Sequence, residues 1–133
     1  MERSDELRDV VLAAFEDFAN QDTSWIDRHT SSHEGVLVIG TDPNEWIEGG
    51  DQVAENAKQE IQESTARFSS PGEVEAFVEG TVGWASARPV WTLEDGGKIP
   101  VRWTGVFHLE DGEWKMVQGH VSVGVPNEDL FGE

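Results

Sequence analysis

The chain has 133 residues, a length typical of one domain. It has no cysteine, which excludes disulfides, thiolate metal sites and a cysteine nucleophile. Nine Lys and Arg residues against 27 Asp and Glu residues give a net charge of −18, and so acidic a surface repels nucleic acids and anionic membranes. Six Trp and six Phe residues argue against disorder. We therefore expect one folded, acidic domain over residues 1–133 that binds neither nucleic acid nor membrane.

The first residues of the chain, Met1 to Glu6, are mostly charged and lack the apolar core of a signal peptide. No apolar run approaches the ~20 residues that cross a bilayer. These features predict a cytoplasmic protein. An acidic folded domain with three Lys residues suits a cytoplasm of high salt concentration, where ions screen the repulsion between carboxylates. The alternative is an ordinary acidic protein.

The first half of the chain contains three helical patterns. Residues 4–20 place apolar side chains at helical spacing, with Ser4 as the N-cap. A short second helix is expected after Thr23. A third helix is predicted to begin with Asp51 as its N-cap, and its apolar face holds Val53, Ala54, Ala57, Ile61 and Phe68.

The remaining segments read as strands. Two short strands are expected at residues 35–40 and 45–48, and four longer ones at residues 74–79, 82–93, 99–109 and 113–125. Helices followed by a run of strands predict an α+β fold. We expect a curved antiparallel sheet that closes over the helices and leaves an internal pocket.

The last hairpin predicts which side chains share a face of the sheet. Asp111-Gly112 is a strong signal for a two-residue turn. Strict pairing outward from this turn puts Trp103, Gln118 and His120 on the inner face, against the helices. The opposite, outer face is expected to form a homodimer surface through the side chains of Val106, Val117, Val121 and Val123.

Three segments of the chain carry a resemblance to a known family. One is the helix end from Glu16 to Asp22, and the next is Gly40-Thr41-Asp42-Pro43-Asn44-Glu45-Trp46. The most specific is Val101-Arg102-Trp103-Thr104-Gly105-Val106-Phe107 with the hairpin Asp111-Gly112-Glu113-Trp114-Lys115-Met116-Val117-Gln118-Gly119-His120. They resemble the nuclear transport factor 2-like superfamily and, within it, the SnoaL-like proteins. The resemblance covers nearly the whole chain.

This resemblance implies a cystatin-like cone, in which a curved antiparallel sheet wraps around about three N-terminal helices and dimerises through its outer face. The family contains enzymes and non-enzymes, so it implies a fold more than a reaction. Its ketosteroid isomerases and dehydratases use tyrosines, and this chain has none. Its polyketide cyclases use an Asp and a His, and His120 is the candidate for that His.

His120 is the main catalytic candidate, because an imidazole titrates near neutral pH and suits acid–base work. The alternative is a core histidine bonded to a backbone carbonyl or to Gln118. Arg88 is a candidate anchor for a ligand carboxylate, provided that Trp84 on the same strand points inward. Pro89 could reset that alternation.

Aromatic side chains are the candidates for the pocket wall. Because ligand sites are mostly apolar with a few polar anchors, the wall is expected to include Phe18, Trp25, Trp46, Trp84 and Trp103, with core packing as the alternative. Asp42 and Glu45 flank Trp46 at the expected pocket mouth, where either a general base or a simple turn would fit.

The spacing of His29 and His33 resembles a metal motif, but we expect a solvated loop there and no metal site. The sequence as a whole predicts a protein that binds a small, largely apolar molecule without a cofactor. If it is catalytic, it is a cyclase-, isomerase- or hydrolase-type enzyme that uses His120. The alternative is a non-catalytic dimerisation or accessory module.

Overall fold

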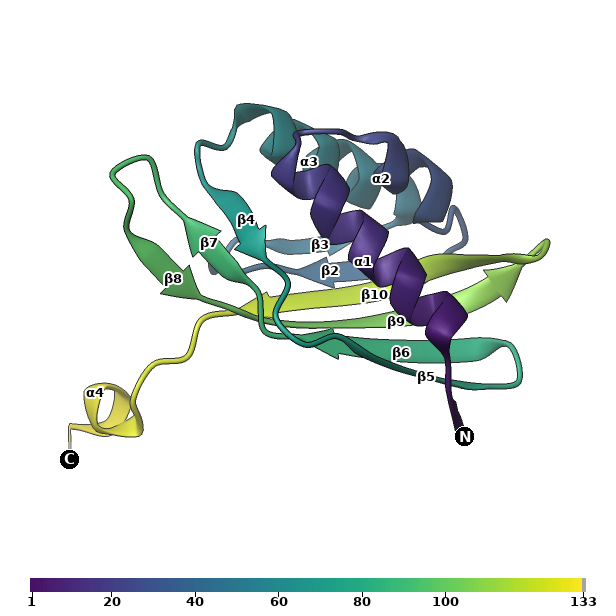
Figure 1. Ribbon diagram of the computed structural model, residues 1–133. Helices are drawn as coiled ribbons and strands as arrows, with labels where there is room; N and C mark the ends of the chain where they lie inside the picture. The colour runs from purple at the N-terminus through teal and green to yellow at the C-terminus, as the bar shows by residue number, and fades with distance from the viewer. Residues whose placement is uncertain (133) are drawn as a thin grey trace.

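The computed structural model describes residues 1–132, so Glu133, the last residue of the predicted domain, lies outside the described part. Figure 1 shows the helices from the first half of the chain on one face of a curved sheet. They are α1 (Asp5–Ala19), α2 (Ser24–His29) and α3 (Gly50–Glu63). A further short helix, α4 (Asn127–Phe131), lies in the C-terminal segment that extends away from the domain. The predicted α+β class is confirmed.

Helix α1 begins where the sequence predicts. The Ser4 side-chain oxygen accepts a hydrogen bond from the Leu7 N–H at 3.0 Å, which satisfies one of the free donors of the first turn. Leu7, Val11 and Phe15 follow at helical spacing and are buried. Burial of this apolar stripe against the sheet holds the helix in position.

Helix α3 begins at Gly50, two residues earlier than an N-cap at Asp51 predicts. Its N-cap is Gly49 and not Asp51, which lies instead in the first turn. A carboxylate is favourable there because the helix dipole leaves positive partial charge at its N-terminus. Within residues 1–132, no helix has both the length and the apolar content needed to cross a membrane.

The strands of residues 1–132 form two sheets. The large one has the order β1 (Glu2–Arg3), β5 (Glu75–Glu79), β6 (Val82–Ala87), β9 (Arg102–Glu110), β10 (Glu113–Ser122), β2 (Leu37–Ile39) and β3 (Trp46–Glu48). The small one has the order β4 (Arg67–Ser70), β7 (Val90–Thr92) and β8 (Lys98–Pro100). All pairings are antiparallel except that of β10 with β2, so the large sheet is mixed and not purely antiparallel as predicted.

The predicted long strand over residues 82–93 is broken where the chain leaves one sheet for the other. Pro89 is buried between β6 and β7, and its carbonyl oxygen accepts a hydrogen bond from the Val101 N–H at 2.9 Å. Proline has no N–H to donate to a neighbouring strand, so the ladder ends there. The chain then turns into the small sheet, which flanks the helices at one end of the domain in Figure 1.

A β-bulge in β10 changes which side chains face the helices. The Asp111-Gly112 turn and the first pairs, such as Met116 with Phe107, are as predicted. Gln118 then pairs with Val106 and not with Gly105, because one extra residue is accommodated on β10. A shift of one residue exchanges the two faces of a strand from that point on.

The bulge has a clear physical benefit. Strict pairing would turn Gln118 and His120 toward the apolar interior, where each unpaired polar group costs about 1–3 kcal/mol. With the bulge, Gly119 is buried and Val121 half-buried, while Gln118 and His120 are exposed. The prediction that His120 and Gln118 face inward is therefore wrong, and so is the prediction that Val121 faces outward.

Candidate functional site

A cavity of about 380 Å³ lies between the helices and the inner face of the sheet. Every helix from α1 to α3 contributes to its wall, as do strands of both sheets. Among the described residues that line it are the aromatic side chains of Phe15, Phe18, Trp25, Phe68, Trp91 and Trp103. The wall is therefore mainly apolar, as the walls of small-molecule sites usually are.

The aromatic side chains hold one another in place. The rings of Phe15 and Trp103 meet edge to face with centroids 5.5 Å apart, and Phe15 meets Phe68 in the same way at 5.2 Å. Trp91 lies against Phe68 with centroids 5.7 Å apart. The Trp25 indole N–H donates to the Val10 carbonyl oxygen at 2.8 Å, which fixes that ring at the helix side of the cavity.

Two acidic side chains interrupt the apolar wall. Glu45, in the turn before β3, and Glu60, on α3, both line the cavity, and their carboxyl groups are placed so that one can donate a hydrogen bond to the other. Such a bond requires a proton on one of the two groups. The surrounding cavity wall removes water from Glu60 and is the main reason that its pKa rises to about 7; the hydrogen bond and the negative charge of Glu45 raise it further.

Glu60 counts as exposed by surface area, since water can reach the cavity through its mouth. Its carboxyl group still has protein atoms on most sides, and this is why desolvation dominates its pKa. At neutral pH the group therefore exists in both protonated and ionised forms. A carboxyl group in this state can donate or accept a proton.

The backbone around β2 and β3 sets the position of Glu45. Its Oε1 atom accepts a hydrogen bond from the Asp42 N–H at 3.0 Å, and its backbone carbonyl accepts one from the Gly40 N–H at 2.8 Å. A Cβ atom on residue 40 would lie 2.3 Å from Glu45 Oε2 and 2.8 Å from Glu45 Cβ. Only glycine at position 40 leaves room for this carboxyl group.

Three of the predicted wall residues line the cavity: Phe18, Trp25 and Trp103. Trp46 does not, because Ile47 takes the inward position of β3. The Trp46 side chain is 59% exposed and donates to Glu48 at 3.1 Å. The prediction that Trp46 faces the cavity is therefore wrong.

Trp84 and Arg88 also lie outside the cavity wall. The inward positions of β6 are Gly83, Ala85 and Ala87, small residues that let α1 approach closely; a Cβ on Gly83 would lie 2.5 Å from a Leu7 methyl group. Trp84 consequently points to the outer face, where it stacks on Phe77, and Arg88 is exposed. The inward orientation predicted for both is wrong.

The sequence contained a signal for the residues that were missed. On α3 the cavity is lined by positions 53, 56, 57, 60 and 61, which together make one helical face, and by the C-cap Ser64. Asn56 and Glu60 stand four residues apart, and the other helical positions of this face, Val53, Ala57 and Ile61, are apolar. Polar residues inside an apolar stripe are candidates for a site, whereas Trp91 carried no comparable signal.

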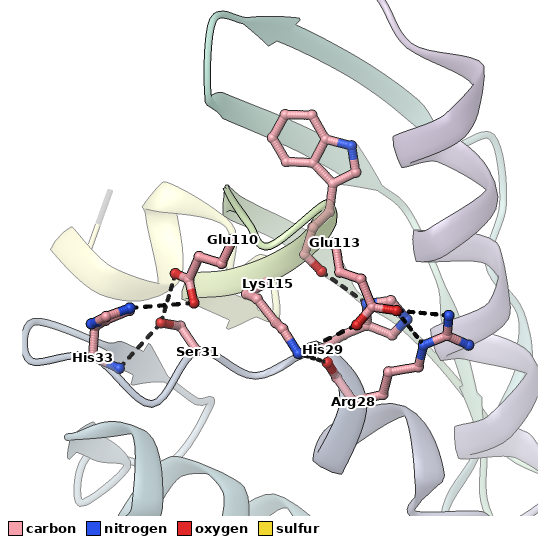
Figure 2. Close-up of polar contacts among 8 residues, drawn as sticks. Arg28, His29, Ser31, His33, Glu110, Glu113 and Lys115 are labelled. Carbon is pink, nitrogen blue, oxygen red and sulfur yellow. Dashed lines mark hydrogen bonds and ion pairs between the residues drawn. The ribbon is translucent and has the colours of Figure 1, made fainter.

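A polar cluster lies on the other side of the sheet. Glu110 accepts hydrogen bonds from the Ser31 hydroxyl at 2.9 Å and from His108 Nδ1 at 3.0 Å, and His33 Nε2 lies 3.6 Å from it (Figure 2 shows Ser31 and His33). Partial burial raises the pKa of Glu110, but these hydrogen bonds and the two histidines outweigh it and hold the pKa below its usual value. The cluster ties the segment after α2 to the last hairpin.

Further contacts in Figure 2 strengthen the same connection. Arg28 donates to Glu113 at 2.8 Å, and Lys115 donates to the Arg28 carbonyl oxygen. His29, expected at the end of the short second helix before a solvated loop, is the last residue of α2 but is buried, and its Nδ1 is 2.8 Å from the Trp114 carbonyl oxygen. In the described part of the chain, no three His, Asp or Glu side chains are arranged to hold a metal ion.

Comparison with solved structures defines the class of fold. A nuclear transport factor 2-like (NTF2-like) protein from Pseudomonas putida KT2440 superposes with a TM-score of 0.80 at 13% identity, over 93% of this chain and 88% of that one. A protein of cystatin-like fold from Caulobacter vibrioides gives 0.76 at 13% identity, over 95% and 92%. A proposed dehydratase of the NTF2-like family from Streptomyces avermitilis gives 0.74 at 14% identity, over 91% and 95%.

The chain therefore has the cystatin-like, NTF2-like fold. The model of the SnoaL-like domain family matches residues 7–126, and the chain belongs to that family. No curated protein sequence matches it significantly. At these identities the structural likeness concerns the fold alone, so the site must be judged from its own geometry.

Proposed function

We propose that the protein binds a small, largely apolar molecule in the cavity and that the Glu45–Glu60 pair transfers a proton to or from it. The observation that carries the proposal is the pair itself, two interacting carboxyl groups in the wall of an apolar cavity of about 380 Å³. A simple structural core would leave neither this space nor this polar pair.

The size and wall of the cavity support the binding part of the proposal. Small-molecule sites usually have volumes of about 300–1,000 Å³ and apolar walls with a few polar anchors. Here the anchors would be Thr41, Asn56 and Ser64 together with the two glutamates. A molecule of roughly two fused rings matches this space.

The carboxyl pair supports the catalytic part. General acid–base catalysis works best when the pKa of the catalytic group lies near the working pH, and the pKa of Glu60 is about 7. Glu45 would hold the proton of Glu60 in place and would stabilise the pair through the shared hydrogen bond. This chemistry needs no cofactor. His120, which is exposed on the outer face, takes no part in it.

Binding can be tested with naphthalen-1-ylmethanol, a neutral two-ring probe, by isothermal titration calorimetry. Ala57 lines the cavity, so Ala57→Phe should fill part of it and weaken binding at least tenfold. Ala13, which is exposed on α1, provides the matched control, and Ala13→Phe should bind as the unmodified protein does. Equal affinity of both variants would place the probe outside the cavity and contradict the proposal.

Proton transfer can be tested with 1-acetylnaphthalene in D₂O, because its methyl hydrogens exchange when a base removes them. The protein should accelerate this exchange, measured by mass spectrometry, and Glu60→Gln should abolish the acceleration. Glu55→Gln removes an exposed charge from the same helix and should leave the rate unchanged. Equal rates for the unmodified protein and Glu60→Gln would exclude this catalytic role.

A second candidate function is a dimerisation module, favoured by a group of apolar side chains on the outer face of the sheet. Val82 is 42% exposed there, beside the half-buried Val106 and Val117. We propose that a second copy of the chain packs on this face. Multi-angle light scattering should then give twice the 14.7 kDa chain mass, and Val82→Asp should reduce it to one chain, unlike Val125→Asp in the C-terminal segment. A dimer that binds no probe would favour an accessory role.

A further inference from the structure

The ionisable side chains of the described cavity wall are all acidic. Among the described residues that line it there are two carboxyl groups, of Glu45 and Glu60, and no Lys, Arg or His. The remaining polar groups are the neutral side chains of Thr41, Asn56 and Ser64. A ligand that enters this cavity therefore meets negative charge that no side chain of the described wall neutralises.

The nearby charged groups are engaged elsewhere. Lys58, on α3, is bonded to Asp27 of α2 at 2.9 Å, and Arg67 of β4 donates to the backbone carbonyls of Ser64 and Ala66. On the elements that pack most extensively against α3, the further charged or titratable side chains are Arg28 and His29 of α2 and Glu48 of β3, and these do not line the cavity. The charge of the pair is thus left for a ligand to balance.

The aromatic wall adds to the same preference. A cation is attracted to the face of an aromatic ring, most strongly to Trp, and the attraction grows where water is excluded. Trp25, Trp91 and Trp103 all line the cavity that contains the carboxyl pair. An anionic ligand would gain neither interaction and would be repelled by the glutamates.

We infer that the ligand of this cavity is an apolar amine, whose ammonium group pairs with Glu45 and Glu60 while its hydrophobic body lies among the aromatic rings. This inference rests on the proposal that the cavity binds a small molecule, and it adds the chemical class of that molecule. It also assigns Glu60 the role of base. The ammonium group displaces the proton that lies between the two carboxyl groups, and Glu60 is then ionised and can accept a proton. The proton of the pair leaves to solvent when the cation binds.

Three probes of one shape test the inference: 1-naphthylmethylamine, naphthalen-1-ylmethanol and 1-naphthoic acid, which at pH 7 are a cation, a neutral molecule and an anion. Titration calorimetry in 0.5 M NaCl reduces the general attraction of the acidic surface for cations. We expect the amine to bind at least tenfold more tightly than the alcohol, and the acid most weakly. An alcohol that binds as tightly as the amine would overturn the inference but leave the proposed function intact; binding of none of the three would overturn both.

Variants test whether the preference for the amine over the alcohol depends on Glu45 and Glu60. Glu60→Gln should reduce the tenfold preference for the amine over the alcohol to less than threefold, and Glu45→Gln should act in the same direction. Glu55→Gln carries the same change of net charge on the exposed side of α3 and should keep the full preference. An equal loss in Glu55→Gln and Glu60→Gln would attribute the preference to the surface and overturn the inference.

The displaced proton gives an independent readout. With a permanent cation, trimethyl(1-naphthylmethyl)ammonium, titrations in buffers of different ionisation enthalpy measure the protons released on binding. Since the pKa of Glu60 is about 7, roughly half a proton should leave per cation bound at pH 7. Affinity should rise as the pH increases from 6 to 8. If no proton is released and the affinity for the cation does not change between pH 6 and 8, the ammonium–carboxylate pairing is overturned.

Discussion

Replacement of Glu60 by Gln should stabilise the protein at pH 8 and leave its stability nearly unchanged at pH 4. The pKa of Glu60 rises from its ordinary 4.5 to about 7 in the folded protein. One pKa unit corresponds to about 1.4 kcal/mol, so the free-energy ceiling is about 3 kcal/mol. Because Glu60 is reached by solvent at the cavity mouth, screening reduces the expected effect to about 1–2 kcal/mol.

The sign follows from the direction of the shift. A raised pKa means that the folded protein holds the proton of Glu60 more tightly than the unfolded chain does. The resulting stabilisation is fully present below pH 4.5 and is lost as the pH rises through about 7. A Gln at this position carries no charge at any pH, so the variant does not suffer that loss.

Thermal unfolding between pH 4 and 9, followed by Trp fluorescence at constant salt, measures this difference. For a domain of this size we expect Glu60→Gln to raise the Tm by about 3–8 °C at pH 8 and by almost nothing at pH 4. Glu55→Gln, on the exposed side of the same helix, should follow the unmodified protein throughout. Parallel curves for the unmodified protein and Glu60→Gln would refute the assignment of a raised pKa.

Three further predictions concern the site, the core and the surface. Gly40→Ala should displace Glu45 and lower the pKa of Glu60, as measured by carboxyl ¹³C chemical shifts. Gly124→Ala, where the added Cβ makes only ordinary contacts, is the control. An unchanged pKa of Glu60 in Gly40→Ala would contradict the close contact between residue 40 and Glu45. Phe107→Ala should cost about 3–5 kcal/mol in urea denaturation, since the side chain is fully buried; a cost below about 1 kcal/mol would disprove that packing. If the charge of −18 is an adaptation to high salt, the Tm should rise toward molar KCl, and a flat or falling profile would count against it.

The features that local chemistry determines were predictable from the sequence. The N-cap at Ser4, the apolar stripe of α1 and the Asp111-Gly112 turn depend on residues that are close in the chain, and the structure confirms each of them. The order of helices and strands was enough for the α+β class. Phe18 and Trp25 line the cavity because they belong to these well-predicted helices.

The site itself depended on features that the local pattern does not encode. A bulge determines which side chains of β10 beyond Met116 point toward the helices. Without it, Gln118 and His120 would be buried without hydrogen-bond partners. The orientation of Trp84 is decided by the close approach of α1 to β6.

The fold class and most of the core were thus determined by the sequence alone, because helical periodicity, caps and turns act over a few residues. Only the tertiary structure decided which polar groups meet in the cavity. Glu45 and Glu60 belong to different elements, and Glu45 stood in the sequence as a candidate base or as part of a turn. The pKa of Glu60 rises to about 7 only because the folded chain surrounds this carboxyl group with the cavity wall, which desolvates it, and brings Glu45 beside it.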